Sequence, residues 1–125
     1  MALPPAIVIH GLAHARLALA AGRPVTLLSA PAAGLYAGCG WWRAVIAAAQ
    51  TDAPDLLDCA DAPGRALEAL SVGCRWLVLR PCSAWDSVAE RSAGQGATLL
   101  RERPPALDLG ERGASRHIAA WLGFG

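Results

Sequence analysis

The sequence predicts an α/β fold, built as an open, mostly parallel sheet of four to five strands with helices on both faces. Short apolar runs rich in β-branched residues alternate with alanine-rich runs of helical length along the whole chain. A parallel sheet covered by helices requires this alternation. Glycine and proline separate the runs, as at Gly22 and Pro24, where one helix ends and the next strand begins.

The 125 residues suit a single domain spanning residues 1–125. The predicted strands cover residues 6–10, 25–29, 55–59, 76–79 and 97–100. The predicted helices cover residues 12–21, 41–50, 61–73, 83–94 and 115–122, with Asp61 and Ser83 as expected N-caps. A long loop follows the second strand, and Arg103-Pro104-Pro105 is expected to be extended.

Five strands are too few to close an eight-stranded barrel. We therefore expect a flavodoxin-like or half-Rossmann sheet with a strand order near 2-1-3-4-5. Right-handed crossovers in that order would give a three-layer sandwich. In such sheets ligands bind at the carboxyl ends of the strands, which is where we look for a site.

Composition excludes several kinds of chemistry. The 11 basic and 10 acidic residues nearly cancel, leaving a net charge of +1 and no basic surface typical of proteins that bind nucleic acid or anionic membranes. The chain contains no lysine, which excludes Schiff-base chemistry, a pyridoxal phosphate aldimine and a Walker-type phosphate loop. It also contains no asparagine, so it has no acceptor for N-glycosylation. No cofactor is identified.

The four cysteines form no C-x-x-C pair, which argues against a zinc knuckle or a redox motif and favours free thiols. The apolar amino-terminal region lacks a basic start and contains Pro4-Pro5, His10 and Arg16, so we expect no export signal. No apolar run reaches the length that spans a membrane. A cytoplasmic protein is the expectation.

One segment carries a local resemblance. The run from Leu57 to Leu67 (LDCADAPGRAL), followed by Gly73 and Leu77-Val78-Leu79, resembles a βαβ unit of the phosphate-binding (β/α) barrel enzymes. The lysine of the aldolase members is missing, so no catalytic residue is transferred. The whole chain also resembles small uncharacterised bacterial α/β proteins, which implies no particular activity.

Polar residues gather where the predicted strands end, and they define a candidate site. We predict catalytic roles for His10 and Asp58, as a base and its orienting carboxylate. The predicted ligand-binding residues are Gly11, Ser29, Tyr36, Cys39, Asp61, Gly64 and Arg80. The loop that carries Tyr36 and Cys39 could form a lid over this edge.

Each of these residues also has a structural interpretation. His10 and His14 have helical zinc-ligand spacing, but no third ligand follows at motif spacing, so no metal site is predicted. Asp58 could instead form a buried salt bridge with Arg80 or Arg65. Cys39 could act as a nucleophile only with a nearby histidine such as His10.

The five tryptophans suggest an alternative function. Trp41 and Trp42 are adjacent, and side chains about 100° apart on a helix do not both enter one small core. The carboxyl-terminal helix carries Trp121 and is followed by Phe124, which gives it an apolar face. We therefore weigh two functions: a site for a small anionic metabolite, with or without catalysis, and a non-catalytic module that forms a homodimer.

Overall fold

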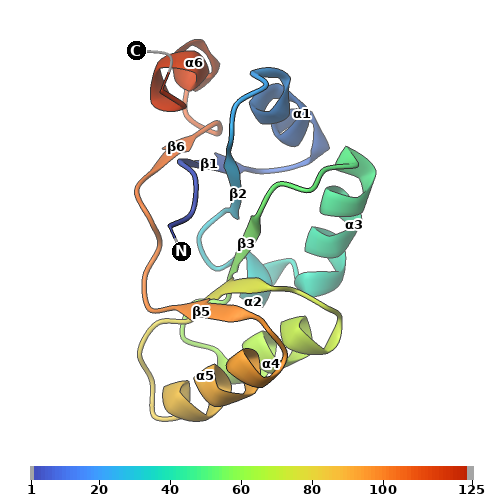
Figure 1. Cartoon of the computed structure of the whole chain (residues 1–125), viewed down its shortest axis with the longest axis vertical. Coiled ribbons are helices and arrows are strands. Elements are labelled where there is room, and N and C mark those ends of the chain that lie inside the picture. Colours follow the sequence, from blue (N-terminus) through green and yellow to red (C-terminus); the bar gives the residue numbers. More distant parts are fainter. Residues whose placement is uncertain (1, 124–125) are drawn as a thin grey trace.

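The computed structural model describes residues 2–123 and contains six parallel strands (Figure 1). The strands are β1 (Ala6–Ile9), β2 (Thr26–Ser29), β3 (Asp55–Asp58), β4 (Trp76–Val78), β5 (Thr98–Leu100) and β6 (Ala106–Asp108). Every neighbouring pair is parallel, in the order β5-β4-β3-β2-β1-β6. The open parallel sheet confirms the predicted flavodoxin-like or Rossmann-like α/β class, with six strands instead of four to five.

The helices fall close to the predicted segments. They are α1 (Leu12–Ala20), α2 (Ala33–Tyr36), α3 (Cys39–Ala49), α4 (Pro63–Ser71), α5 (Trp85–Gly94) and α6 (Ile118–Trp121), the last preceded by the 3-10 turn η1 (Ala114–His117). The short α2 lies inside the predicted loop. Asp61 and Ser83 are not caps, because α4 and α5 begin after Ala62 and Ala84 without a side-chain hydrogen bond. Phe124 lies outside the described residues.

The strand order and the placement of the helices differ from the expectation. From β1 to β5 each strand lies beside its predecessor, instead of in the order 2-1-3-4-5. Right-handed crossovers that always step in one direction put every helix on the same face. Accordingly α1, α3, α4 and α5 contact one another in sequence on one side of the sheet (Figure 1). The three-layer sandwich with helices on both faces is therefore wrong for this sheet.

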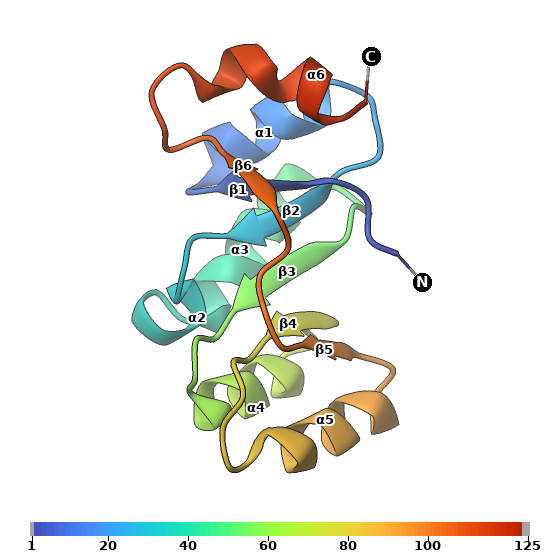
Figure 2. The ribbon, with the colours of Figure 1, turned by 90° about the vertical axis from the view of Figure 1, so that its left-hand side faces the viewer.

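A short segment covers the opposite face. Residues 101–105, here called the crossing segment, connect β5 at one edge to β6 at the other and pass in front of the sheet in Figure 2. Five strand spacings amount to about 24 Å in a flat sheet. The six residue steps from Leu100 to Ala106 reach about 20 Å when extended. The sheet must therefore curve toward the crossing segment.

The two faces bury different sets of apolar side chains. On the helical face the strand residues pack with the helices around the fully buried Trp42. The other face holds a smaller cluster in which all the buried members come from strands: Ala6, Val8, Leu28, Leu56 and Val78. Trp121 connects the carboxyl-terminal helix α6 to strand β1, because its indole N–H donates to the main-chain oxygen of Ala6 at 2.7 Å. Within residues 2–123, no helix is both long enough and apolar enough to cross a bilayer.

Gly34 allows α2 to lie directly on the end of β3. A Cβ atom at this position would stand 3.0 Å from both the main-chain oxygen of Asp58 and the Sγ atom of Cys59. We expect Gly34→Ala to lower the free energy of unfolding by about 1–3 kcal/mol, because it overpacks a closed contact.

Urea denaturation measures this effect, and Gly40→Ala is the matched control. A Cβ atom at Gly40 meets nothing within 4 Å. Alanine in a helix is favoured over glycine, so the control should be neutral or more stable by up to about 1 kcal/mol. Equal destabilisation by both substitutions would contradict the close-contact explanation.

Candidate functional site

Four polar side chains at the carboxyl ends of the strands face the crossing segment. Side chains alternate between the two faces of a strand. Val8, Leu56 and Val78 belong to the cluster on the face without helices. Two residues further along, His10, Asp58 and Arg80 fall on that same face, and Asp108 of β6 joins them by pairing with His10.

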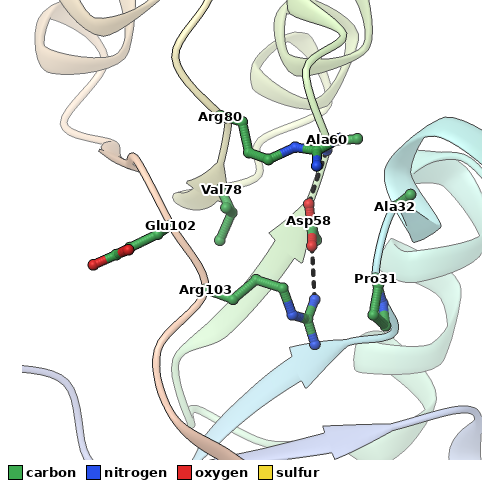
Figure 3. Close-up of a pocket in the computed structure, with 8 residues that line it drawn as sticks. All are labelled: Pro31, Ala32, Asp58, Ala60, Val78, Arg80, Glu102 and Arg103. Carbon is green, nitrogen blue, oxygen red and sulfur yellow. Dashed lines mark hydrogen bonds and ion pairs between the residues drawn. The ribbon is translucent and has the colours of Figure 1, made fainter.

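Asp58 and Arg103 form an ion pair that ties the crossing segment to the sheet (Figure 3). Arg103 Nη1 donates to Asp58 Oδ2 at 2.7 Å and to the main-chain oxygen of Ser29 at 3.0 Å. The other carboxylate oxygen of Asp58 accepts the N–H of Ala60 at 2.8 Å. Asp58 is only 4% exposed, and these donors replace the water that it loses.

A pocket of about 230 Å³ opens beside this ion pair. It is lined by Pro31, Ala32, Asp58, Ala60, Val78, Arg80, Glu102 and Arg103 (Figure 3). Ala32 and Ala60 have φ angles of 60° and 54°, which alanine rarely adopts. Backbone strain of this kind is concentrated at functional sites.

His10 pairs with Asp108 and not with the predicted Asp58. His10 Nε2 lies 2.7 Å from Asp108 Oδ1, and the N–H of Gly110 donates to the same oxygen at 2.8 Å. Burial alone would raise the pKa of Asp108, but the hydrogen bonds from His10 and Gly110, together with the charges of His10 and Arg103, hold it below its usual value. The ring of His14 packs edge-on against that of His10, and its Nδ1 accepts the N–H of His10 at 3.1 Å.

The structure brings together only part of the predicted site. Asp58 and Arg80 share the pocket, and Ser29 contributes its main-chain oxygen to Arg103 and its hydroxyl to the N–H of Asp58. Gly11 lines a separate shallow cavity with His10. The remaining predicted residues, Tyr36, Cys39, Asp61 and Gly64, are not among the residues that line the Asp58 pocket. Tyr36 is 83% exposed and does not cover it.

Sequence reasoning missed Arg103 and Asp108. Arg103 lies after the predicted fifth strand, in a segment for which the sequence predicts only an extended backbone. No sequence signal indicates that it contacts Asp58, which lies 45 residues earlier in the chain. Asp108 ends β6, a three-residue strand without a β-branched residue that pairs with β1 across 98 residues. Both positions depend on long-range pairing.

Two of the four cysteines, Cys59 and Cys74, are buried thiols. Burial raises the pKa of the Cys59 thiol to about 12 and that of Cys74 to about 11. Both thiols are therefore protonated at neutral pH and poor nucleophiles. All four cysteines are unpaired. Among residues 2–123 there is no group of three or more His, Cys, Asp or Glu side chains arranged to hold a metal ion.

Comparison with known proteins gives no family for this chain. No protein-family model matches the sequence, and no curated protein is significantly similar to it. The strands β3 and β4, joined through α4, form a parallel βαβ unit.

Removing Arg103 should destabilise the fold, because it leaves the buried Asp58 carboxylate without its charged partner. We expect Arg103→Gln to lower the free energy of unfolding by about 2–3 kcal/mol, less than for a fully buried pair because Arg103 is partly exposed and Ala60 still donates.

Arg101→Gln is the control for this substitution within the same segment. The guanidinium of Arg101 lies on the surface over the Trp85 ring, 4.0 Å from its centroid. Its loss should cost less than about 1 kcal/mol in urea denaturation. Similar losses for the two variants would show that the Asp58 contact does not fasten the crossing segment.

The lowered pKa of Asp108 makes its contribution to stability depend on pH. A carboxyl whose pKa is lowered by folding stabilises the protein above its ordinary pKa of 3.8, and that stabilisation is lost as the pH falls through the folded-state value. The stability advantage of the wild type over Asp108→Asn should therefore shrink between pH 5 and pH 3.

The pKa of Asp55 is shifted in the opposite direction to that of Asp108, so Asp55 serves as a comparison. Burial raises its pKa despite the nearby Arg43 and the hydrogen bond from Trp42. Ionisation of Asp55 therefore opposes folding, and its protonated form contributes stability that is lost as the pH rises through the folded-state value. Urea denaturation of Asp55→Asn at the same two pH values should show the opposite trend. The same trend for both variants would contradict these assignments.

Proposed function

We propose that the protein binds a small anionic metabolite, carboxylated or phosphorylated, in the pocket between Arg80 and Arg103. The main support is the Asp58–Arg103 contact, which holds a guanidinium in place at the pocket wall before any ligand arrives. Guanidinium groups recognise carboxylates and phosphates through paired N–H donors. A fixed donor also avoids part of the ordering cost of binding.

Arg103 retains donors for such a ligand. Among the described residues its hydrogen bonds, to Asp58 and Ser29, both come from Nη1. A guanidinium carries five N–H groups, so those on Nη2 and Nε remain for an anion. Arg80 lines the same pocket from the end of β4.

The charges and the size of the pocket favour a small anion. Four charged side chains line the pocket. The negative charge of Asp58 is compensated by Arg103, so the charges that remain are the positive one of Arg80 and the negative one of Glu102. Glu102 is exposed, and in Figure 3 its carboxylate points away from Asp58. The volume of about 230 Å³ is below the range of about 300–1,000 Å³ typical of drug-sized ligands. A few-carbon acid or phosphate suits it better than a dinucleotide.

The segment that resembles the phosphate-binding barrels supplies part of this pocket. Asp58, Ala60, Val78 and Arg80 all belong to β3, β4 or the turns that follow them. The carboxyl ends of β-strands form the active-site face of such barrels. This local likeness supports an anion site at the same edge of the sheet.

The alternative of a non-catalytic homodimer has less support. Trp42 is fully buried and donates its indole N–H to Asp55 at 3.2 Å, while Trp41 is partly buried against the core. Trp121 is 37% exposed but already bonds Ala6. These tryptophans therefore pack mainly inside the protein. They do not provide a large exposed surface for a second copy of the chain.

Thermal-shift and calorimetric titrations test the proposal. Inorganic phosphate and a panel of short carboxylates and sugar phosphates serve as probes, each organic probe with a neutral analogue. We expect anionic probes alone to stabilise the protein. Arg80→Ala should weaken their binding at least about tenfold, because a hydrogen bond to a charged group is lost.

Arg91→Ala is the matched control, since Arg91 is an exposed arginine in the last turn of α5. Its affinity for the anionic probes should equal that of the wild type. No binding of any anion, or equal losses in the Arg80 and Arg91 variants, would refute the proposed site.

A further inference from the structure

We propose that His10, held in place by Asp108, is the proton acceptor for an enolisable carbonyl compound whose anionic group lies on Arg80 and Arg103. This inference rests on the proposed function and adds a reaction class and a substrate class to it. The substrate would be a small keto acid or keto phosphate that loses a proton from the carbon next to its carbonyl group.

The His10–Asp108 contact has the features of an oriented base. The two side chains approach to 2.7 Å, and Gly110 donates its N–H to the same carboxylate oxygen at 2.8 Å. A Cβ atom at Gly110 would stand 2.7 Å from His10 Nε2, so a side chain there would displace the imidazole ring from Asp108. A base that is aligned by a carboxylate, which also stabilises the protonated ring, is the arrangement found in catalytic histidines.

The nitrogen that can accept a proton follows from this contact. The Asp108 carboxyl has a lowered pKa and is ionised at neutral pH, so it accepts a hydrogen bond from the N–H on His10 Nε2. Nδ1 then carries the lone pair. The His10 side chain is 38% exposed and lines its own cavity of about 280 Å³ with Gly11 and His14, so the ring is accessible from solvent.

The pair lies at the same edge of the sheet as the anion pocket. His10 follows β1 and Asp108 ends β6, and these two strands are the one neighbouring pair in the sheet that is not consecutive in the chain. The ends of β1 and β3 are two strand spacings apart, about 10 Å. Arg103 acts on both carboxylates, since it contacts Asp58 and its charge also helps to lower the pKa of Asp108.

Acid–base chemistry fits these residues better than covalent catalysis. The Ser29 hydroxyl donates to the main-chain oxygen of Ala30 and accepts the N–H of Asp58, so both of its roles are occupied. Cys59 is fully buried and its thiol stays protonated. Neither side chain is prepared for nucleophilic attack.

The proposed step balances in protons and electrons. The carbon–hydrogen bond breaks and its proton forms a new N–H bond on Nδ1 of His10. The electron pair moves into the carbonyl group, which becomes an enolate. The Arg103 guanidinium can stabilise the negative charge on the enolate oxygen, and the imidazolium is stabilised by Asp108. Return of the proton restores the substrate or gives its isomer.

Deuterium exchange tests this step without knowledge of the product. The probes are short 2-oxo carboxylates and keto phosphates that bind in the calorimetric assay, incubated with the protein in D₂O and followed by NMR. We expect the wild type to replace the hydrogen next to the carbonyl group with deuterium. His10→Gln should slow this exchange at least about 100-fold while retaining anion affinity. Asp108→Asn should slow it at least about tenfold.

The controls separate this inference from the proposed function. His117→Gln changes an exposed histidine in η1 and should exchange at the wild-type rate. Nitrogen-15 NMR should find the hydrogen of His10 on Nε2 in the wild type and a mixture of tautomers in Asp108→Asn. Binding without exchange, or unchanged exchange in His10→Gln, would overturn the proton-transfer role alone. Failure of every anionic probe to bind would overturn both proposals.

Discussion

The ion pair between Asp58 and Arg103 is the interaction on which the candidate site depends. It joins the end of a central strand to a segment that connects opposite edges of the sheet. Because the crossing segment is too short to connect the edges of a flat sheet, the sheet curves beneath it. The contact therefore fixes a guanidinium and shapes one wall of the pocket.

The strand order explains why one face was left for polar groups. Every step from β1 to β5 moves in the same direction, so right-handed crossovers place the intervening helices on one side. The other side holds only a small apolar cluster, and the crossing segment runs over it (Figure 2). Near the carboxyl ends of the strands that face carries His10, Asp58, Arg80 and Asp108; His10 pairs with Asp108, and Asp58 pairs with Arg103.

Polar groups inside the protein are accommodated by pairing. Among residues 2–123 every buried side-chain nitrogen or oxygen has a hydrogen-bond partner. Thr26 donates to the main-chain oxygen of Pro4 and Ser92 to that of Val88, each at 2.8 Å, which are structural roles. Asp58 differs because its partners come from Ala60 and the crossing segment, and because it also lines a pocket. Asp58 is therefore a candidate for a functional site, whereas Thr26 and Ser92 are ordinary buried polar residues whose hydroxyl groups bond main-chain oxygens.

The sequence alone determined the five strands and four main helices of the βα repeat, since apolar periodicity and glycine stops act locally. It also pointed to Asp58 and Arg80, because residues that follow parallel strands share one edge of a sheet. Only the tertiary structure decided the strand order, the single helical face, the addition of β6 and the partners of His10 and Asp58. Those features depend on contacts between residues far apart in the chain, such as Asp108 with His10 and Arg103 with Asp58, and local propensity carries no information about them.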